Sequence, residues 1–376
     1  MSVAPRRVAV SGNSSWNIVA FRTGLIRGLR EQGYEPVVIA PIDPDGEERM
    51  TKLGLERIVI HIDRSGLNPF ADFGLMLTYR SILKRLRPIA YLGFTIKPNV
   101  YGCIAARMLG VPALANISGL GTVFIRRGPL LALVTALYRF ALSRAAVVFF
   151  QNPDDRALFV ERRIVRPDQA RLLPGSGVDL DRFKPAPLPD GPVTFLFIGR
   201  LLGDKGVREF IEAARQLRRE LPDARFELLG PLDEGNRTAI GKDELDRWVA
   251  EGAIDYLGGT DDVRPFIARA TVVVLPSYRE GLPRSLLEAG AMARPAVATD
   301  VPGCREAVVD GETGFLCRAR DSRSLAEAMK RLATLSGEER KAMGVAARRR
   351  VEEKFSETVV ISAYLGELGK ISKAGS

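Results

Sequence analysis

Two glutamates in the second half of the chain, Glu280 and Glu288, are separated by seven residues that include Gly281 and Pro283. The β-branched apolar run at 271–276 predicts a buried parallel strand, and Pro283 suits the first turn of a helix that follows it. Glu280 is then expected in the loop at the carboxyl end of the strand, and Glu288 in the helix. Ionised carboxylates only accept hydrogen bonds, so this pair suits a ligand rich in hydroxyl groups. The alternative is a pair of solvated acids at a helix start, which the helix dipole favours.

Two basic side chains lie near a second predicted strand end. The run 193–199 predicts a buried strand that ends at Gly199; Arg200 follows it, and Lys205 precedes an amphipathic helix from about residue 206 to 220. A guanidinium binds oxyanions through two hydrogen bonds and an ammonium acts as a point charge, so this turn suits a diphosphate. A basic surface loop is the alternative.

Alternating strand-like and helix-like runs must position these groups. Such runs fill both halves of the chain, and a proline-rich stretch at 173–192 separates the halves. This pattern predicts an α/β fold with parallel sheets. We expect two Rossmann-like domains, at residues 1–185 and 190–355, that face each other across a ligand-binding cleft.

The composition restricts the function classes. The chain has 376 residues and a formal net charge of +10, which favours an anionic partner such as a nucleotide, an acidic lipid surface or nucleic acid. No nucleic-acid-binding motif accompanies the charge, so we expect no such partner. Cys103, Cys304 and Cys317 form no CxxC pair, which argues against zinc and for a reducing compartment, with the cytosol as the expected location.

Several weaker signals are interpreted as structural. The acidic triplets Asp43-Pro-Asp45 and Asp179-Leu-Asp181 match a metal-chelating pattern, but they lie in loop-like sequence, and we predict no metal site. The single histidine, His61, lies in the apparent strand at 57–62 and is interpreted as a core or strand-end residue, which disfavours a histidine-centred triad.

One apolar segment carries basic flanks. Residues 130–142 are strongly apolar, and four arginines lie in or beside this run, at Arg126, Arg127, Arg139 and Arg144. The run is too short to span a bilayer, but such a helix can lie on an anionic membrane surface with its basic side chains at the lipid phosphates. A buried core helix with a basic exit is the alternative.

Three sequence phrases together resemble one enzyme family. GRLLGDKG at 199–206, SYREGLPRSLLEAGAMARPAVATDVPGCREAV at 277–308 and DGETGFL at 310–316 closely resemble the retaining glycosyltransferases of family four, which have the GT-B fold. The phrases SGLNPF at 65–70, KPNVYG at 97–102 and NISGLG at 116–121 resemble bacterial enzymes that add a sugar to an undecaprenyl-diphosphate-linked saccharide.

The resemblance implies a role for each motif residue. Arg200 and Lys205 would hold the donor diphosphate and stabilise the leaving nucleotide, Glu288 would bind the ribose hydroxyls, and Glu280 would contact the donor sugar. Backbone close to the donor is implied at four further positions: Gly12, Gly199, Gly281 and Leu282. No metal and no cofactor beyond the nucleotide sugar would be needed. The C-terminal helix at 356–376 would cross back onto the N-terminal domain.

The acceptor side departs from the family pattern. Many relatives carry a histidine where this chain has Ser118, so acceptor contacts are assigned to Lys97, Asn99, Ser118 and Gly119. The implied reaction moves a hexose-type sugar, with UDP as the preferred nucleotide, to a polyprenyl-diphosphate-linked saccharide at the cytoplasmic face of the inner membrane. We expect a monomer or weak dimer. A soluble acceptor, or epimerisation of a UDP-sugar by an enzyme of the same fold, remain as alternatives.

Overall fold

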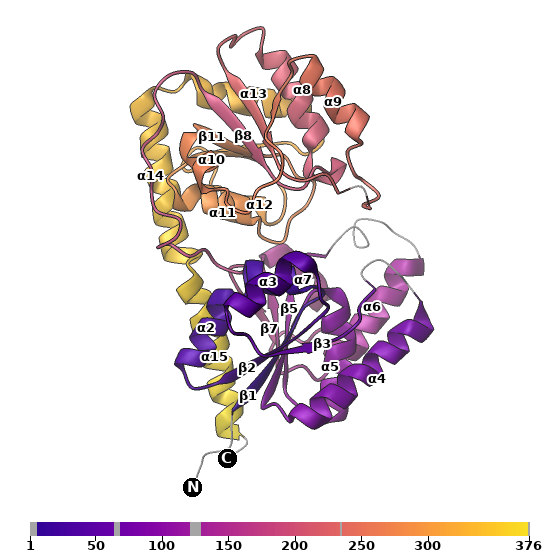
Figure 1. Ribbon diagram of the computed structural model, residues 1–376. Helices are drawn as coiled ribbons and strands as arrows, with labels where there is room; N and C mark the ends of the chain where they lie inside the picture. The colour runs from indigo at the N-terminus through magenta and orange to yellow at the C-terminus, as the bar shows by residue number, and fades with distance from the viewer. Residues whose placement is uncertain (1–5, 64–67, 121–128, 234, 375–376) are drawn as a thin grey trace. The chain divides into compact units, whose positions relative to one another are not determined.

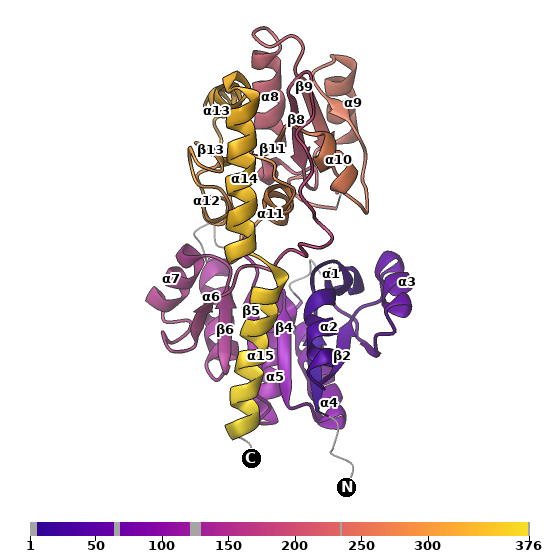
Figure 2. The same ribbon diagram turned by 90° about the vertical axis from the view of Figure 1, so that its left-hand side faces the viewer.

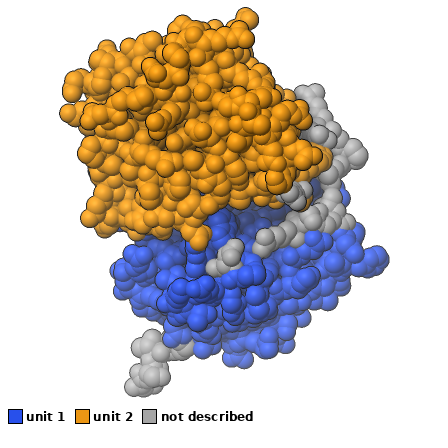
Figure 3. All heavy atoms as spheres, turned by 45° about the horizontal axis from the view of Figure 1, so that its top comes forward, with its two compact units in different colours: residues 1–176, 357–376 blue, residues 177–356 orange. Residues whose placement is uncertain are grey.

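The computed structural model describes residues 6–63, 68–120, 129–233 and 235–374 (Figure 1). The chain divides into two compact units, shown in separate colours in Figure 3: unit 1 is Met1–Ser176 with Glu357–Ser376, and unit 2 is Gly177–Ser356. Each described unit contains one sheet whose strand pairs are all parallel.

The sheet of unit 1 has the order β3-β2-β1-β4-β5-β6-β7. Its strands are β1 (Arg7–Ser11), β2 (Glu35–Ala40), β3 (Arg57–Val59), β4 (Ala90–Phe94), β5 (Ala113–Ile117), β6 (Val147–Phe150) and β7 (Ala170–Leu172). The order reverses between β1 and β4, and ligands of open α/β sheets bind outside the carboxyl ends of strands at such a point.

Helices cover both faces of this sheet (Figure 1). One apolar core lies beneath a first group of helices, namely α4 (Pro69–Leu86), η1 (Pro98–Gly102), α5 (Cys103–Met108), α6 (Pro129–Leu142) and α7 (Pro153–Glu161). A second core lies on the opposite face, beneath α1 (Ser15–Phe21), α2 (Thr23–Glu31), α3 (Pro44–Lys52) and α15 (Glu357–Ala374). The C-terminal helix α15 packs beside α2 in unit 1 (Figure 2).

The sheet of unit 2 has the order β10-β9-β8-β11-β12-β13. Its strands are β8 (Thr194–Ile198), β9 (Arg225–Leu229), β10 (Asp255–Tyr256), β11 (Val272–Leu275), β12 (Ala296–Thr299) and β13 (Gly314–Cys317). Its helices are η3 (Gly203–Lys205), α8 (Val207–Leu217), α9 (Lys242–Ala250), α10 (Arg264–Arg269), α11 (Arg284–Ala291), α12 (Cys304–Ala307), α13 (Ser322–Thr334) and α14 (Gly337–Lys354).

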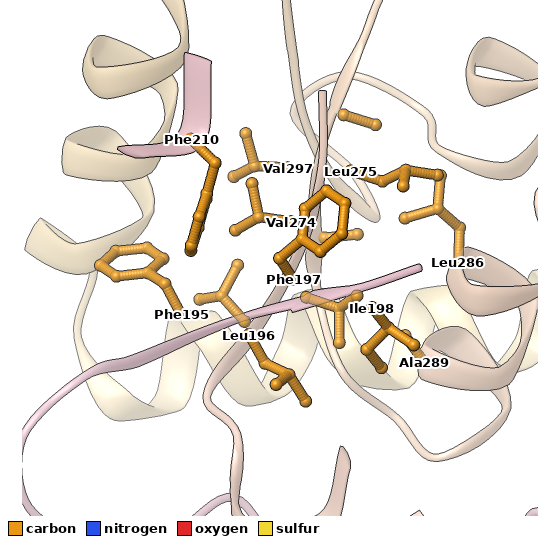
Figure 4. Close-up of a cluster of buried hydrophobic side chains, with 14 of the residues drawn as sticks. Phe195, Leu196, Phe197, Ile198, Phe210, Val274, Leu275, Leu286, Ala289 and Val297 are labelled. Carbon is orange, nitrogen blue, oxygen red and sulfur yellow. The ribbon is translucent and has the colours of Figure 1, made fainter. Parts of the chain in front are cut away.

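Strand β8 lies at the centre of the apolar core of unit 2 (Figure 4). Its five residues are all buried, and the ring of Phe197 lies 5.9 Å from that of Phe210 on α8. Leu286 and Ala289 of α11 enter the same core. The loops that follow β8 and β11 therefore start from fixed positions at one edge of the sheet.

The expected domain boundary at residue 185 differs from the division found at Ser176–Gly177. The reason is packing: Val178 and Phe183 are buried in the apolar core of unit 2. The buried guanidinium of Arg294 also donates to the carbonyl oxygens of Ala186 and Pro187, at 2.8 and 2.6 Å. The proline-rich stretch is thus part of unit 2 for most of its length.

Candidate active site

A glycine brings the loops after β8 and β11 together. Gly206, which follows η3, has a φ angle of +76°, and a Cβ atom there would lie 2.1 Å from the carbonyl oxygen of Pro276. Only glycine accommodates both the left-handed backbone and this close approach. The amide of Tyr278 also donates to the carbonyl oxygen of Asp204 at 2.9 Å. The turn that carries Lys205 is therefore held against the loop that carries Glu280.

Lys205 and Glu280 form an ion pair in this place. The Nζ atom of Lys205 lies 2.5 Å from Oε1 of Glu280, and the hydroxyl of Ser277 donates to the same oxygen at 2.6 Å. The side chains of Lys205 and Glu280 keep only 25% and 11% of their surface exposed. No described residue donates to Oε2 of Glu280, which leaves that oxygen available as an acceptor.

Glu288 is buried on α11, where Leu286, Leu287 and Gly290 also enter the core as the helical spacing predicted. Arg284, one turn earlier, donates through Nε to Oε1 of Glu288 at 2.6 Å. Burial raises the pKa of Glu288 above its usual value, although Arg284 acts in the opposite direction. Pro283 is the N-cap of α11, and no side chain caps this helix. The solvated helix start is therefore not the environment of Glu288.

Arg200 forms an ion pair of its own. Its side chain is 56% exposed, and its guanidinium pairs with Asp233 at 2.7 Å. The backbone beside it is crowded at Gly230, where φ is +156° and a Cβ atom would lie 1.8 Å from the carbonyl oxygen of Gly199. A Cβ atom on Gly199 itself would meet only the ring of Phe197 at ordinary distances. The position that requires glycine is therefore 230, which the sequence reasoning did not select.

The sequence reasoning missed further residues of this site. Ser277 and Arg284, which hold the two glutamates, lie inside the motif, and the spacing of Arg284 and Glu288 was a usable signal for an i,i+4 pair. Gly303 has a φ angle of +84°, and a Cβ atom there would lie 2.5 Å from the carbonyl oxygen of Gly281. Asp233, the partner of Arg200, carried no signal. The close approach of Gly303 to the carbonyl oxygen of Gly281 also fixes the backbone of the motif at Gly281 and the adjoining Leu282.

The remaining predicted contacts belong to unit 1. Gly12 directly follows β1, and its amide donates to the carbonyl oxygen of Ile39 at 3.3 Å. Lys97 is only 14% exposed because its ammonium pairs with Asp72 at 2.7 Å. The side-chain amide of Asn99 donates to the carbonyl oxygen of Asn116 at 2.7 Å. Gly12, Lys97 and Asn99 therefore lie at the carboxyl edge of the sheet of unit 1.

Ser118 and Gly119 follow β5 at the same edge. Ser118 is exposed, and its hydroxyl donates to the side-chain oxygen of Asn116 at 3.1 Å. The side-chain amide of Asn116 in turn donates to the hydroxyl of Tyr364 on α15 at 3.0 Å. Gly119 has a φ angle of +132°. The loop at 118–119 is thus tied to the C-terminal helix through one buried asparagine.

Of the four arginines expected at a membrane, Arg126 and Arg127 lie outside the described residues. Arg139 on α6 is exposed, but its guanidinium donates to the carbonyl oxygens of Arg162 and Arg163 at 2.8 and 3.0 Å. Arg144 is exposed directly after α6. No helix within the described parts of the chain is long and apolar enough to cross a membrane.

The acidic triplets have local structural roles. Asp43 caps α3 by accepting from the amide of Gly46, and Asp179 accepts from the amides of Asp181 and Arg182. No group of three or more metal-ligating side chains occurs among the described residues. His61 is exposed and lies two residues after β3.

Two family models match the chain. The model described as "Glycosyl transferase 4-like domain" matches residues 18–175, and the model described as "Glycosyl transferases group 1" matches residues 192–334. The chain is 27% identical over 386 residues to the N,N'-diacetylbacillosaminyl-diphospho-undecaprenol alpha-1,3-N-acetylgalactosaminyltransferase of Campylobacter jejuni, covering 98% of this chain and 99% of that enzyme. It is 25% identical to the UDP-Gal:alpha-D-GlcNAc-diphosphoundecaprenol alpha-1,3-galactosyltransferase of Escherichia coli, covering 69% and 70% of the two chains.

Solved structures share the fold over nearly the whole chain. A glycosyltransferase from Rickettsia africae matches with a TM-score of 0.80 at 18% identity, covering 99% of this chain and 100% of that one. HepE of Anabaena, in complex with UDP and glucose, matches with a TM-score of 0.80 at 16% identity, covering 96% and 99%. The fold and the paired motifs therefore define a glycosyltransferase of GT-B fold. Between them, the two glycosyltransferase models cover residues 18–175 and 192–334, which confirms the resemblance of the motifs to the glycosyltransferases of family four.

Proposed function

We propose that this glycosyltransferase moves a hexose-type sugar from a UDP-sugar to a polyprenyl-diphosphate-linked saccharide in bacterial surface polysaccharide or glycan assembly, with retention of configuration. The contact that carries the proposal is the ion pair of Lys205 with Glu280, 2.5 Å apart, with Ser277 on the same oxygen. This ion pair places a cation that can bind phosphate beside a carboxylate that can accept hydrogen bonds from sugar hydroxyls. The full-length likeness to the Campylobacter jejuni enzyme supports the acceptor class.

The donor diphosphate is assigned to Lys205, Arg200 and the N-terminus of α11. Lys205 has three N–H donors, of which one lies on Glu280, so two are left for phosphate oxygens. The first amides of α11 lack a side-chain cap, and such a helix end favours an anion. Arg200 is exposed and reaches phosphate by leaving Asp233, a surface pair that costs little to open.

The donor hydroxyls are assigned to the two glutamates. No described residue donates a hydrogen bond to Oε2 of Glu280. A hydroxyl group of the transferred sugar donates a hydrogen bond to this oxygen. Glu288 accepts from the ribose hydroxyls. Because Glu288 is buried, it holds these hydroxyls away from bulk water. A hydrogen bond is stronger in such a shielded place, and one to a charged group is stronger than one between neutral groups.

The reaction develops charge next to these groups. The bond between the anomeric carbon and the phosphate oxygen breaks, the acceptor hydroxyl oxygen bonds to that carbon, and its proton passes to the leaving phosphate. Negative charge grows on the diphosphate, so the fixed cations of Lys205 and Arg200 stabilise the transition state more than the ground state. No metal is needed to neutralise the leaving group.

The acceptor is assigned to unit 1. The carboxyl edge of its sheet carries Ser118, Gly119 and the Lys97–Asp72 pair beside the strand-order reversal. A polyprenyl tail keeps such an acceptor in a bilayer, so the enzyme works at the cytoplasmic face of the inner membrane without spanning it. The net charge of +10 favours an anionic membrane surface.

A donor screen followed by a transfer assay tests the proposal. Purified protein is titrated with UDP-GlcNAc, UDP-GalNAc, UDP-hexuronic acids and GDP-mannose, and the bound donor is then incubated with polyprenyl-diphosphate-linked saccharides. We expect one UDP-sugar to bind and to be transferred with retained anomeric configuration, in the presence of a chelator. Transfer only to soluble sugars would refute the lipid-linked acceptor. Conversion of the UDP-sugar without acceptor would refute transfer and establish an epimerase.

A further inference from the structure

Helix α4 exposes a row of large apolar side chains. Phe70, Phe73 and Leu77 are 89%, 60% and 45% exposed, although solvent-exposed phenylalanine is normally isolated. Their spacing of three and four residues puts them on one side of the helix. The opposite side of α4 is buried in the core of unit 1. The row is therefore an outward surface that the fold of unit 1 does not use.

Basic side chains continue the same row. Arg80 and Lys84 follow Leu77 at the same helical spacing, both are exposed, and neither forms an ion pair with a described residue. The single acid of α4, Asp72, is buried and neutralised by Lys97. We call Phe70, Phe73, Leu77, Arg80 and Lys84 the α4 face. Its outward charge is exclusively positive.

The neighbouring helices extend this apolar surface. Helix α4 packs on α5, and α5 packs on α6, so the three helices cover one side of the sheet of unit 1 (Figure 1). On α6, Leu133 and Phe140 are each 56% exposed and lie seven residues apart, which again places them on one side of the helix. Helix α6 contains no acidic residue.

We infer that the α4 face, continued by Leu133 and Phe140, docks the enzyme on an anionic lipid bilayer. This inference rests on the proposed lipid-linked acceptor and names the surface that brings unit 1 to it. Aromatic rings enter the boundary between headgroups and acyl chains, while Arg80 and Lys84 bind lipid phosphates. The arginine that α6 contributes in the described chain, Arg139, is already bound to carbonyl oxygens, so α4 supplies the lipid contacts.

Charge decides between a bilayer and a second copy of the chain. Two copies that met through the α4 face would bring Arg80 and Lys84 of one copy near those of the other, without an exposed acid on α4 or any acid on α6 to neutralise them. An anionic bilayer attracts the same side chains, and each basic residue near such a surface strengthens binding about fivefold. The bilayer is therefore the occupant that the face fits.

Vesicle co-sedimentation tests the inference. The vesicles are phosphatidylcholine alone or mixed with phosphatidylglycerol, and the variants are Phe70→Ser/Phe73→Ser and Arg80→Glu/Lys84→Glu. We expect the wild type to bind mixed vesicles, the serine variant to bind at least about tenfold more weakly, and the charge reversal to abolish the preference for phosphatidylglycerol. The control is Val345→Ser on α14 of unit 2, which changes an apolar side chain that is 58% exposed and leaves binding unchanged.

Two results would overturn the docking surface: wild-type binding by the serine variant, or a dimer that this variant converts to monomers. Failure of the proposed function gives a different result. Transfer to a water-soluble short-chain diphosphate-linked acceptor, measured without vesicles, is expected to be the same in the serine variant and the wild type. If the wild type binds mixed vesicles through the α4 face but transfers to no diphosphate-linked acceptor, the docking surface stands and the proposed function is wrong.

Discussion

Replacing Lys205 by alanine tests whether its cation serves the reaction or only the fold. Removal of a donor to developing charge costs about 3–4 kcal/mol, so we expect kcat to fall by about 100- to 1000-fold. The change also leaves Glu280 without its counter-ion. Exposed pairs contribute about 0–1 kcal/mol, and breaking a buried one costs about 3–5 kcal/mol. With 25% and 11% of the two side chains exposed, we expect a stability loss of about 2 kcal/mol.

The second substitution Glu280→Gln separates the two effects. It removes the uncompensated carboxylate, so Lys205→Ala/Glu280→Gln is expected to regain most of the lost stability while kcat stays low. Transfer is measured with saturating donor and acceptor, and stability by urea unfolding. Lys242→Ala is the matched control, because Lys242 forms an exposed pair with Asp246. Turnover near the wild-type rate in folded Lys205→Ala, or recovery of turnover in the double variant, would refute the assignment.

Three further predictions concern the same unit. Because burial raises the pKa of Glu288, its ionised form is lost as the pH falls, before the ordinary value of 4.5 is reached. Affinity for UDP, measured by calorimetry, should therefore fall more steeply over that range in the wild type than in Glu288→Gln. Gly206→Ala should lower the free energy of unfolding by at least about 2 kcal/mol, because of the positive φ and the contact with Pro276, whereas Gly337→Ala, with open space around it, should change it by less than about 0.5 kcal/mol. Arg294 is fully buried and donates to carbonyl oxygens, so Arg294→Met should cost about 3–5 kcal/mol in urea unfolding without changing kcat of the folded fraction.

The fold could be predicted from the sequence wherever a strand was long and apolar. Strands β8 and β11 lie within the apolar runs that predicted them, because strands buried on both faces read as continuous apolar runs. The edge strands β7 and β10 have three and two residues, too few for a pattern. The boundary at 185 was wrong because proline marks irregular backbone and does not indicate which core that backbone packs on.

The site was predictable in its residue types but not in its pairing. The spacing of Glu280 and Glu288 placed one in a loop and one in a helix, as the structure has them. That Lys205 binds Glu280, 75 positions away, depends on the close approach at Gly206, and nothing in the sequence reports the neighbour of a glycine. Arg200 matches the same motif as Lys205, yet it pairs with Asp233 instead.

The pairing of Lys205 with Glu280 explains how a cation is kept in a shielded place before the donor binds. An ammonium that is 25% exposed and unpaired would lose hydration without compensation, and it would move toward water. Glu280 and Ser277 hold it in position through one carboxylate oxygen. In the proposed reaction the diphosphate joins this pair, so the ammonium interacts with two anions whose charges change differently. The charge of Glu280 is constant, while that of the leaving phosphate grows as the bond breaks. The attraction between the Lys205 ammonium and the phosphate is therefore stronger in the transition state than in the ground state.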